Sequence, residues 1–159
     1  MSCDARFKEE AAALGYCFEG DLKIGGNYVP LIRDGRNIYV SGQIPRVGNE
    51  VVVTGAAGNQ IDLSCAQLAA KICVMRALAL LQRSLGSLER VKTIPSISVF
   101  VQSAQHFTQQ SEVADGASEL LFRILGPAGA HTRTSVGVFQ LPKNATVELS
   151  MVATASSAT

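Results

Sequence analysis

The chain has 159 residues, of which 47% are hydrophobic and 17% are charged, and its formal net charge is +1. This length predicts a single domain. The balanced charge, with no basic run and no interleaving of basic and aromatic residues, disfavours nucleic acid as the main partner. A low charged fraction leaves less surface that must stay wet, which favours burial between subunits.

Four cysteines and two histidines are scattered along the chain. No two cysteines form a C-x-x-C pair and neither histidine clusters with them, so the pattern predicts no metal site. The first ten residues carry acidic side chains and no apolar segment, which argues against a signal peptide. Free thiols without a secretion signal are typical of a reducing compartment, and we expect the protein to be cytoplasmic.

A short helix is predicted at the start of the chain, followed by strands separated by tight turns. The strands alternate apolar and polar residues, and we expect them over residues 28–33, 37–41 and 51–54. The helix spans residues 4–14 and ends at Gly15. Asp34-Gly35 is predicted to form a hairpin turn in which both residues have positive φ. Because Pro30 has no N–H, the first strand should lie at an edge of the sheet.

A long helix is predicted over residues 62–85, where apolar side chains recur on one stripe at helical spacing. Ser64 and Gln67 offer a capping box at its start, and Gly86 offers a stop. Three charges interrupt this stretch, and we take them to exclude a membrane span: Lys71, Arg76 and Arg83.

A second long helix is predicted over residues 108–125, after a central strand over 97–101. Gly116 in the middle of this helix costs about 1 kcal/mol relative to alanine, so we expect close packing there. The order of elements indicates an α+β fold with a mixed sheet of five or six strands. The two long helices would cover one face, and the other face must meet solvent or another subunit.

The stretch over residues 131–154 is predicted to form two strands joined by a polar turn. Alternate apolar positions should face the core: Thr134, Val136 and Val138 on the first strand, and Val147, Leu149 and Met151 on the second. The open face would then carry Arg133, Ser135, Glu148 and Ser150. Arg133 and Glu148 either pair with each other or with other charges, or they belong to a binding site.

Two motifs resemble the hallmarks of the YjgF/Rid family, also known as endoribonuclease L-PSP or reactive-intermediate deaminases. One is R-x-x-V-x-V-x-x-L-P followed by V-E-L, which starts at Arg133, and the other is Y-V-S-G-Q-I-P over residues 39–45. The resemblance covers residues 26–154, which leaves residues 1–25 as an N-terminal leader and residues 155–159 as a frayed tail. It implies a chorismate-mutase-like fold assembled as a homotrimer, with pockets between subunits.

The resemblance also implies roles for particular residues. Arg133 matches the arginine that holds a substrate carboxylate, for which its planar fork is suited. Glu148 matches a glutamate that holds and activates water. The remaining matches are expected to bind substrate: Tyr28, Gly42 and Ser135. The implied activity is the hydrolysis of small enamine or imine acids such as 2-aminoacrylate to 2-keto acids and ammonia, without metal or cofactor.

The chain departs from the family pattern in several places. His131-Thr132 replaces a Pro-Ala pair before the arginine, and Ala114-Asp115 stands where an asparagine is often found. His131 is either a pocket residue or a structural one. Two alternatives to a deaminase therefore remain open. One is a non-catalytic trimer that binds small carboxylates or proteins. The other is an RNA-cleaving enzyme, which the two separated histidines disfavour because such cleavage usually needs two titrating groups near pH 7.

Overall fold

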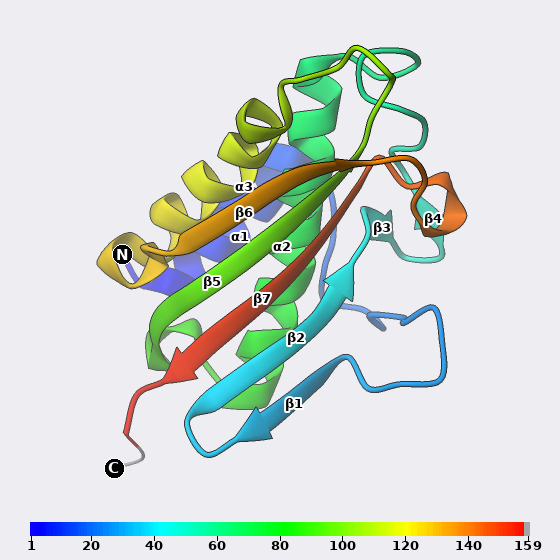
Figure 1. Cartoon of the computed structure of the whole chain (residues 1–159). Coiled ribbons are helices and arrows are strands. Elements are labelled where there is room, and N and C mark those ends of the chain that lie inside the picture. The colour runs from blue at the N-terminus through cyan, green and yellow to red at the C-terminus, as the bar shows by residue number, and fades with distance from the viewer. Residues whose placement is uncertain (158–159) are drawn as a thin grey trace.

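The structure of the chain, a computed structural model that describes residues 1–157, is built on one mixed sheet with α-helices on one face (Figure 1). The α-helices within those residues are α1 (Cys3–Leu14), α2 (Leu63–Leu85) and α3 (Gln110–Leu125). The strands lie side by side in the order β1 (Leu31–Asp34), β2 (Asn37–Gln43), β7 (Val147–Ala155), β5 (Val91–Gln102) and β6 (Thr132–Val138). β5 and β6 are parallel, whereas the other neighbours are antiparallel. The predicted α+β fold, with five strands in this sheet, is therefore confirmed.

α2 is the central helix of the core, because it packs on the sheet, on α3 and on α1. Its length and composition would also suit a membrane span, so its three charges do not exclude one as predicted. However, 67% of the apolar stretch is buried inside the fold. Burial against three neighbours accounts for an apolar surface that extends well beyond one stripe.

The turns between the first strands largely follow the prediction. β3 (Arg46–Val47) and β4 (Glu50–Val51) form a small separate hairpin around Gly48, whose φ is 61°. β1 is an edge strand, as the missing N–H of Pro30 indicated. The turn between β1 and β2 lies one residue later than predicted, at Gly35-Arg36, because Asp34 already pairs with Asn37. Of those two turn residues only Gly35 has positive φ.

The ends of the long helices show how they are held. The N-cap of α2 is Asp62, whose side chain accepts a hydrogen bond from the Cys65 N–H at 2.8 Å, so the predicted Ser64–Gln67 capping box is wrong. The Gln67 side chain donates instead to the Glu112 carbonyl, across to α3. The two helices approach closely at Gly116, where an added Cβ would lie 2.8 Å from the Gln67 carbonyl oxygen.

The orientation of β6 is the reverse of the prediction. Arg133 pairs with Ile97 and Ser135 pairs with Val99, and both β5 partners are buried beneath the helices. Paired residues in a sheet share a face, so Arg133 and Ser135 point towards α3. Glu148, by contrast, pairs with Phe100 on the open face. Arg133 and Glu148 therefore lie on opposite faces, with β5 between their strands.

Both ends of the chain pack against this core. Phe7 of α1 meets Phe18 edge to face, with ring centroids 6.5 Å apart, and Leu22 is also buried. At the other end Ala155 is buried and pairs with Val91, so a frayed tail would start after it. The prediction for residues 158–159 lies outside the described residues.

Candidate functional site

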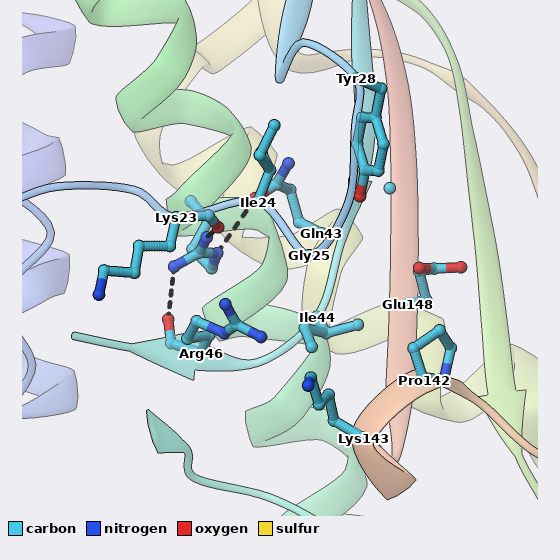
Figure 2. A pocket seen from close by; sticks show the side chains of 12 residues that line it. Lys23, Ile24, Gly25, Tyr28, Gln43, Ile44, Arg46, Pro142, Lys143 and Glu148 are labelled. Atoms are coloured by element: carbon cyan, nitrogen blue, oxygen red, sulfur yellow. Dashed lines mark hydrogen bonds between the residues drawn. The ribbon is translucent and has the colours of Figure 1, made fainter. Parts of the chain in front are cut away.

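A cavity of about 210 Å³ opens beside the end of β2 (Figure 2). Its walls come from residues 23–28, where the leader joins the rest of the chain, from residues 42–46, from residues 142–148 and from Arg76 of α2. Three of the predicted site residues meet here: Tyr28, Gly42 and Glu148. The other two, Arg133 and Ser135, lie on the opposite face of the sheet and do not line the cavity.

Glu148 is held against the backbone of β2 at an irregularity in the strand. The pairing of β2 with β7 shifts register between Val40 and Gln43, and Gly42 lies inside that bulge. A Cβ added to Gly42 would lie 3.0 Å from the Glu148 carboxyl carbon and 3.1 Å from its Oε1. Burial raises the pKa of Glu148 above its ordinary value. A glutamate with a raised pKa is a better proton acceptor, as general base catalysis requires.

Tyr28 forms the rim of the cavity on the leader side. Its ring lies over Gly26, where an added Cβ would be only 2.8 Å from Cε1. The side chain is about half exposed, at 51%. Figure 2 shows its hydroxyl end turned towards the cavity. A tyrosine in this position offers one hydrogen bond and an apolar wall to a small ligand.

The buried wall of the cavity carries Arg76, whose exposure is only 2%. Its guanidinium donates to the Gln43 side-chain oxygen at 3.0 Å and to the carbonyl oxygens of Arg46 and Lys23, both at 2.8 Å. All three acceptors are neutral, and among residues 1–157 no carboxylate forms an ion pair with it. Burial, and then the nearby positive charge of Arg46, lower the pKa of Arg76.

Arg76 escaped the sequence analysis because it stands in an apolar helix, where it was interpreted only as a barrier to membrane insertion. The signal in the sequence was that a charged residue is rare in so apolar a helix. A buried arginine needs partners for its N–H groups, and no acidic residue lies within one helical turn of it. Together with Arg46 and Lys143, it gives the cavity a positive wall.

Arg133 is occupied by partners on α3. Its Nη1 donates to Asp115 Oδ1 and to Ser118 Oγ, both at 2.9 Å, and its Nη2 donates to Ser111 Oγ at 2.8 Å. Of the interpretations left open by the sequence, pairing with another charge is the one observed within a single chain. The partner is Asp115, one of the departures from the family pattern.

His131 lies behind this arginine and not in the cavity. Its Nδ1 is 2.7 Å from the Gly129 carbonyl oxygen, which can only accept, so Nδ1 carries the hydrogen. Nε2 then accepts from the Ser118 hydroxyl at 2.8 Å, while Ser118 accepts from Arg133. His131 thus helps to fix the position of Arg133. Ser135 Oγ is buried, with no hydrogen-bond partner among residues 1–157.

No group of three or more histidine, cysteine, aspartate or glutamate side chains that could hold a metal ion occurs within the described part of the chain. The cavity instead offers one carboxylate, one phenol and several cations. This set can bind a small anion and accept a proton.

Comparison with known proteins identifies the family. The model of the family described as "YjgF/chorismate mutase-like, putative endoribonuclease" matches residues 10–154, so this chain belongs to that family. Protein TCP17 of Trypanosoma cruzi is 40% identical over 124 residues, which cover 77% of this chain and 78% of that protein. The resemblance inferred from the two motifs is confirmed.

Solved structures agree over nearly the whole chain. Atu1372 of Agrobacterium tumefaciens, a protein of unknown function, superposes with a TM-score of 0.86 at 35% identity, covering 97% of this chain and 92% of that one. The structure of a putative endoribonuclease from Shewanella oneidensis MR-1 superposes with a TM-score of 0.88 at 26% identity, covering 97% of this chain and 99% of that one. Both matches include the leader as well as the sheet.

Proposed function

We propose that this protein hydrolyses small enamine or imine acids of the 2-aminoacrylate type to 2-keto acids and ammonia, at sites formed between three copies of the chain. The observation that carries the proposal is Glu148, which is partly buried in the cavity, has a raised pKa and is held against Gly42. The family match over residues 10–154, a range that includes Gly42 and Glu148, supports it.

The chemistry needs one base and one anion-binding group. Glu148 takes a proton from water as the water oxygen adds to the carbon of the protonated imine. The same carboxyl group then returns the proton to nitrogen. The C–N bond then breaks and ammonia leaves, while the Glu148 carboxylate takes the hydroxyl proton and the carbonyl of the keto acid forms. A protonated imine is already electrophilic, so this route needs no further activation.

Arg133 enters this site only from a neighbouring copy. In one chain it lies on the far face of the sheet from Glu148, but β6 is an edge strand and can approach another molecule. The open face of the sheet also exposes large apolar side chains, which a subunit interface would cover: Ile32, Tyr39 and Val136. A homotrimer would bury them and bring Arg133 of one copy to the cavity of the next.

The activity is tested by following keto acid release from 2-aminoacrylate that a pyridoxal-phosphate dehydratase generates in the same cuvette. Wild-type protein should accelerate the release over buffer, and Glu148→Gln should lose most of the acceleration. No acceleration by the wild type would contradict the proposal. Light scattering should give three times the chain mass of 16.8 kDa, and a stable monomer would contradict the composite site.

A second candidate is a trimer that binds small carboxylates without turning them over. The observation in its favour is the set of cations that line the cavity, Arg46, Arg76 and Lys143, which can bind a carboxylate without using Glu148 as a base. Binding of 2-oxobutanoate that is unchanged in Glu148→Ala, together with absent turnover by the wild type, would favour this function over the first.

A further inference from the structure

The charges around the cavity are not balanced. The described residues that line it include Arg46, Arg76 and Lys143, and Glu148 is the one carboxylate among them. Lys23 also belongs to the lining, but Figure 2 shows its ammonium group directed away from the other side chains. Within residues 1–157, none of these cations forms an ion pair with an acidic side chain. The cavity therefore keeps a net positive charge.

Arg76 fixes this charge deep in the wall. Three neutral oxygens hold its guanidinium in place, so it cannot swing out to solvent. Charges act over longer distances where water is excluded. Arg76 thus makes the cavity attractive to anions even where it does not touch them.

Arg46 and Lys143 supply the groups that can touch an anion. The Nε atom of Arg46 is buried without a hydrogen-bond partner among residues 1–157, and a buried unsatisfied N–H is costly. Lys143 has a φ of 61°, in the left-handed region that residues other than glycine rarely adopt. Strain of this kind clusters at binding sites. In Figure 2 both side chains reach towards Ile44.

Figure 2 shows Glu148 on one side of the cavity, away from the Arg46 guanidinium on the other. A reacting imine must approach the carboxylate, because that is the base. A negatively charged group would be repelled there and attracted to Arg46 and Lys143. The volume of about 210 Å³ lies below the range of roughly 300–1,000 Å³ of sites for drug-sized ligands, so the ligand is metabolite-sized.

We propose that the cavity selects small acids with a second anionic group, a carboxylate or a phosphate, which Arg46 and Lys143 bind at the end away from Glu148. The inference rests on the proposed function for which end of the ligand reacts. Binding of the second group does not depend on turnover.

The test is calorimetric binding of a matched pair of keto acids at fixed salt. 2-Oxopentanedioate and 2-oxopentanoate have the same chain length and differ only in the terminal carboxylate. The diacid should bind wild-type protein about tenfold tighter or more, as expected for one charged hydrogen bond. Arg46→Ala and Lys143→Ala should each weaken the diacid by a similar factor and leave the monoacid within about twofold.

Two controls remove a cation elsewhere on the surface. Arg36 in the β1–β2 turn and Lys92 on β5 are exposed and do not line the cavity, so Arg36→Ala and Lys92→Ala should keep the preference for the diacid.

Competition with inorganic phosphate identifies the second anionic group. Displacement of the diacid by phosphate at similar concentration assigns a phosphate-bearing ligand, and no displacement assigns a dicarboxylate.

Equal affinity of the two acids for the wild type overturns the proposal, and so does the absence of binding by either. If Arg46→Ala weakens both acids equally, these cations hold the single carboxylate of a monoacid and the proposal is also wrong. Thermal melts show whether each variant is folded, and Arg46→Gln replaces the alanine variant if that one is not. Failure of the deaminase assay with an intact diacid preference would contradict the proposed function alone.

Discussion

Two buried or partly buried arginines of this chain meet their environment in opposite ways. Arg133 on β6 keeps 21% of its side chain exposed and pairs with the carboxylate of Asp115. Arg76 on α2 is 2% exposed and is held by three neutral oxygens. The charge of Arg133 is neutralised by an adjacent carboxylate. The charge of Arg76 is stabilised only by neutral hydrogen-bond acceptors.

The difference indicates which positive charge no acidic side chain compensates. Removing a charge from water is costly unless a partner compensates for it. Asp115 compensates Arg133 locally, so a single chain has no need of an anion there. Arg76 has only dipoles around it, and its positive potential extends into the cavity that Glu148 shares. The predictions below test this contrast, beginning with the largest effect.

Arg76→Ala should produce the greatest loss of stability. It removes hydrogen bonds to the leader, to β2 and to β3, and leaves a gap in the core. We expect a loss of about 3 kcal/mol. For a chain of this size that corresponds to a melting temperature lower by roughly 6–12 °C. Differential scanning calorimetry measures it.

Arg83 offers the matched control, because it lies on the same helix and also donates to carbonyl oxygens of the leader, among them those of Phe18 and Glu19. Unlike Arg76 it is exposed. Arg83→Ala should therefore cost less than about 1 kcal/mol, because water replaces the lost contacts. Equal losses in the two variants would show that burial of Arg76 has no special role.

Gly42→Ala tests whether Gly42 positions the Glu148 carboxylate in the cavity. The new Cβ would displace Glu148, and Gly42 does not have positive φ, so the backbone tolerates alanine. General base catalysis contributes about 10²–10⁴-fold, and a displaced base should cost tenfold or more in kcat/KM for keto acid release. Stability should fall by less than about 1 kcal/mol.

The control for that variant is Gly25→Ala. Gly25 also lines the cavity, but an added Cβ would meet nothing within 4 Å. Its kcat/KM should stay within about twofold of the wild type, since nothing touches the new methyl group. A similar loss of activity in both variants would remove the argument that Gly42 positions Glu148.

Much of the fold could be predicted because it depends on local patterns. α1 and α2 end at Gly15 and Gly86 as predicted, since glycine readily adopts the left-handed conformation found there, which other residues avoid. The capping residue of α2 was missed because Asp62 and Ser64 are both good caps, and only the backbone conformation decides between them.

The orientation of β6 could not be predicted from alternation alone. A period of two gives two faces but does not say which one the helices cover. Val136 was predicted to face the core, yet it is 39% exposed on an edge strand. The face of β6 that meets α3 carries Arg133 instead, which donates a hydrogen bond to Asp115. Tyr28, Gly42 and Glu148 do meet in one cavity. The positive wall was missed because Arg46, Arg76 and Lys143 come from three separate segments.

The pair of Arg133 and Asp115 can be measured by a double-mutant cycle. The side chain of Asp115 is 52% exposed, so water weakens the interaction. We expect Arg133→Ala, Asp115→Ala and the double variant to give a coupling of about 0.5–1 kcal/mol by urea unfolding. No coupling would mean that Ser111 and Ser118 hold Arg133 without the carboxylate.

The smallest effect on stability should come from Glu148→Gln, and its sign follows from the direction in which the pKa of Glu148 is shifted. Burial raises the pKa of Glu148 in the folded protein above its ordinary value of 4.5. The folded state then binds this proton more tightly than the unfolded chain does, which stabilises the fold fully below the ordinary value. That contribution is lost as the pH rises through the higher folded value. Above the folded pKa, the carboxylate is ionised and desolvated, which destabilises the folded state. Glutamine carries no charge and avoids this cost. Glu148→Gln should therefore melt at a higher temperature than the wild type at pH 7–8, and the difference should shrink towards pH 4.5 and below.

Glu50→Gln, which removes an exposed glutamate from β4, serves as the control for loss of a surface charge. A variant less stable than the wild type at neutral pH would mean that the cations of the cavity already stabilise the ionised carboxylate, and the positive wall would then have its counter-ion within the chain.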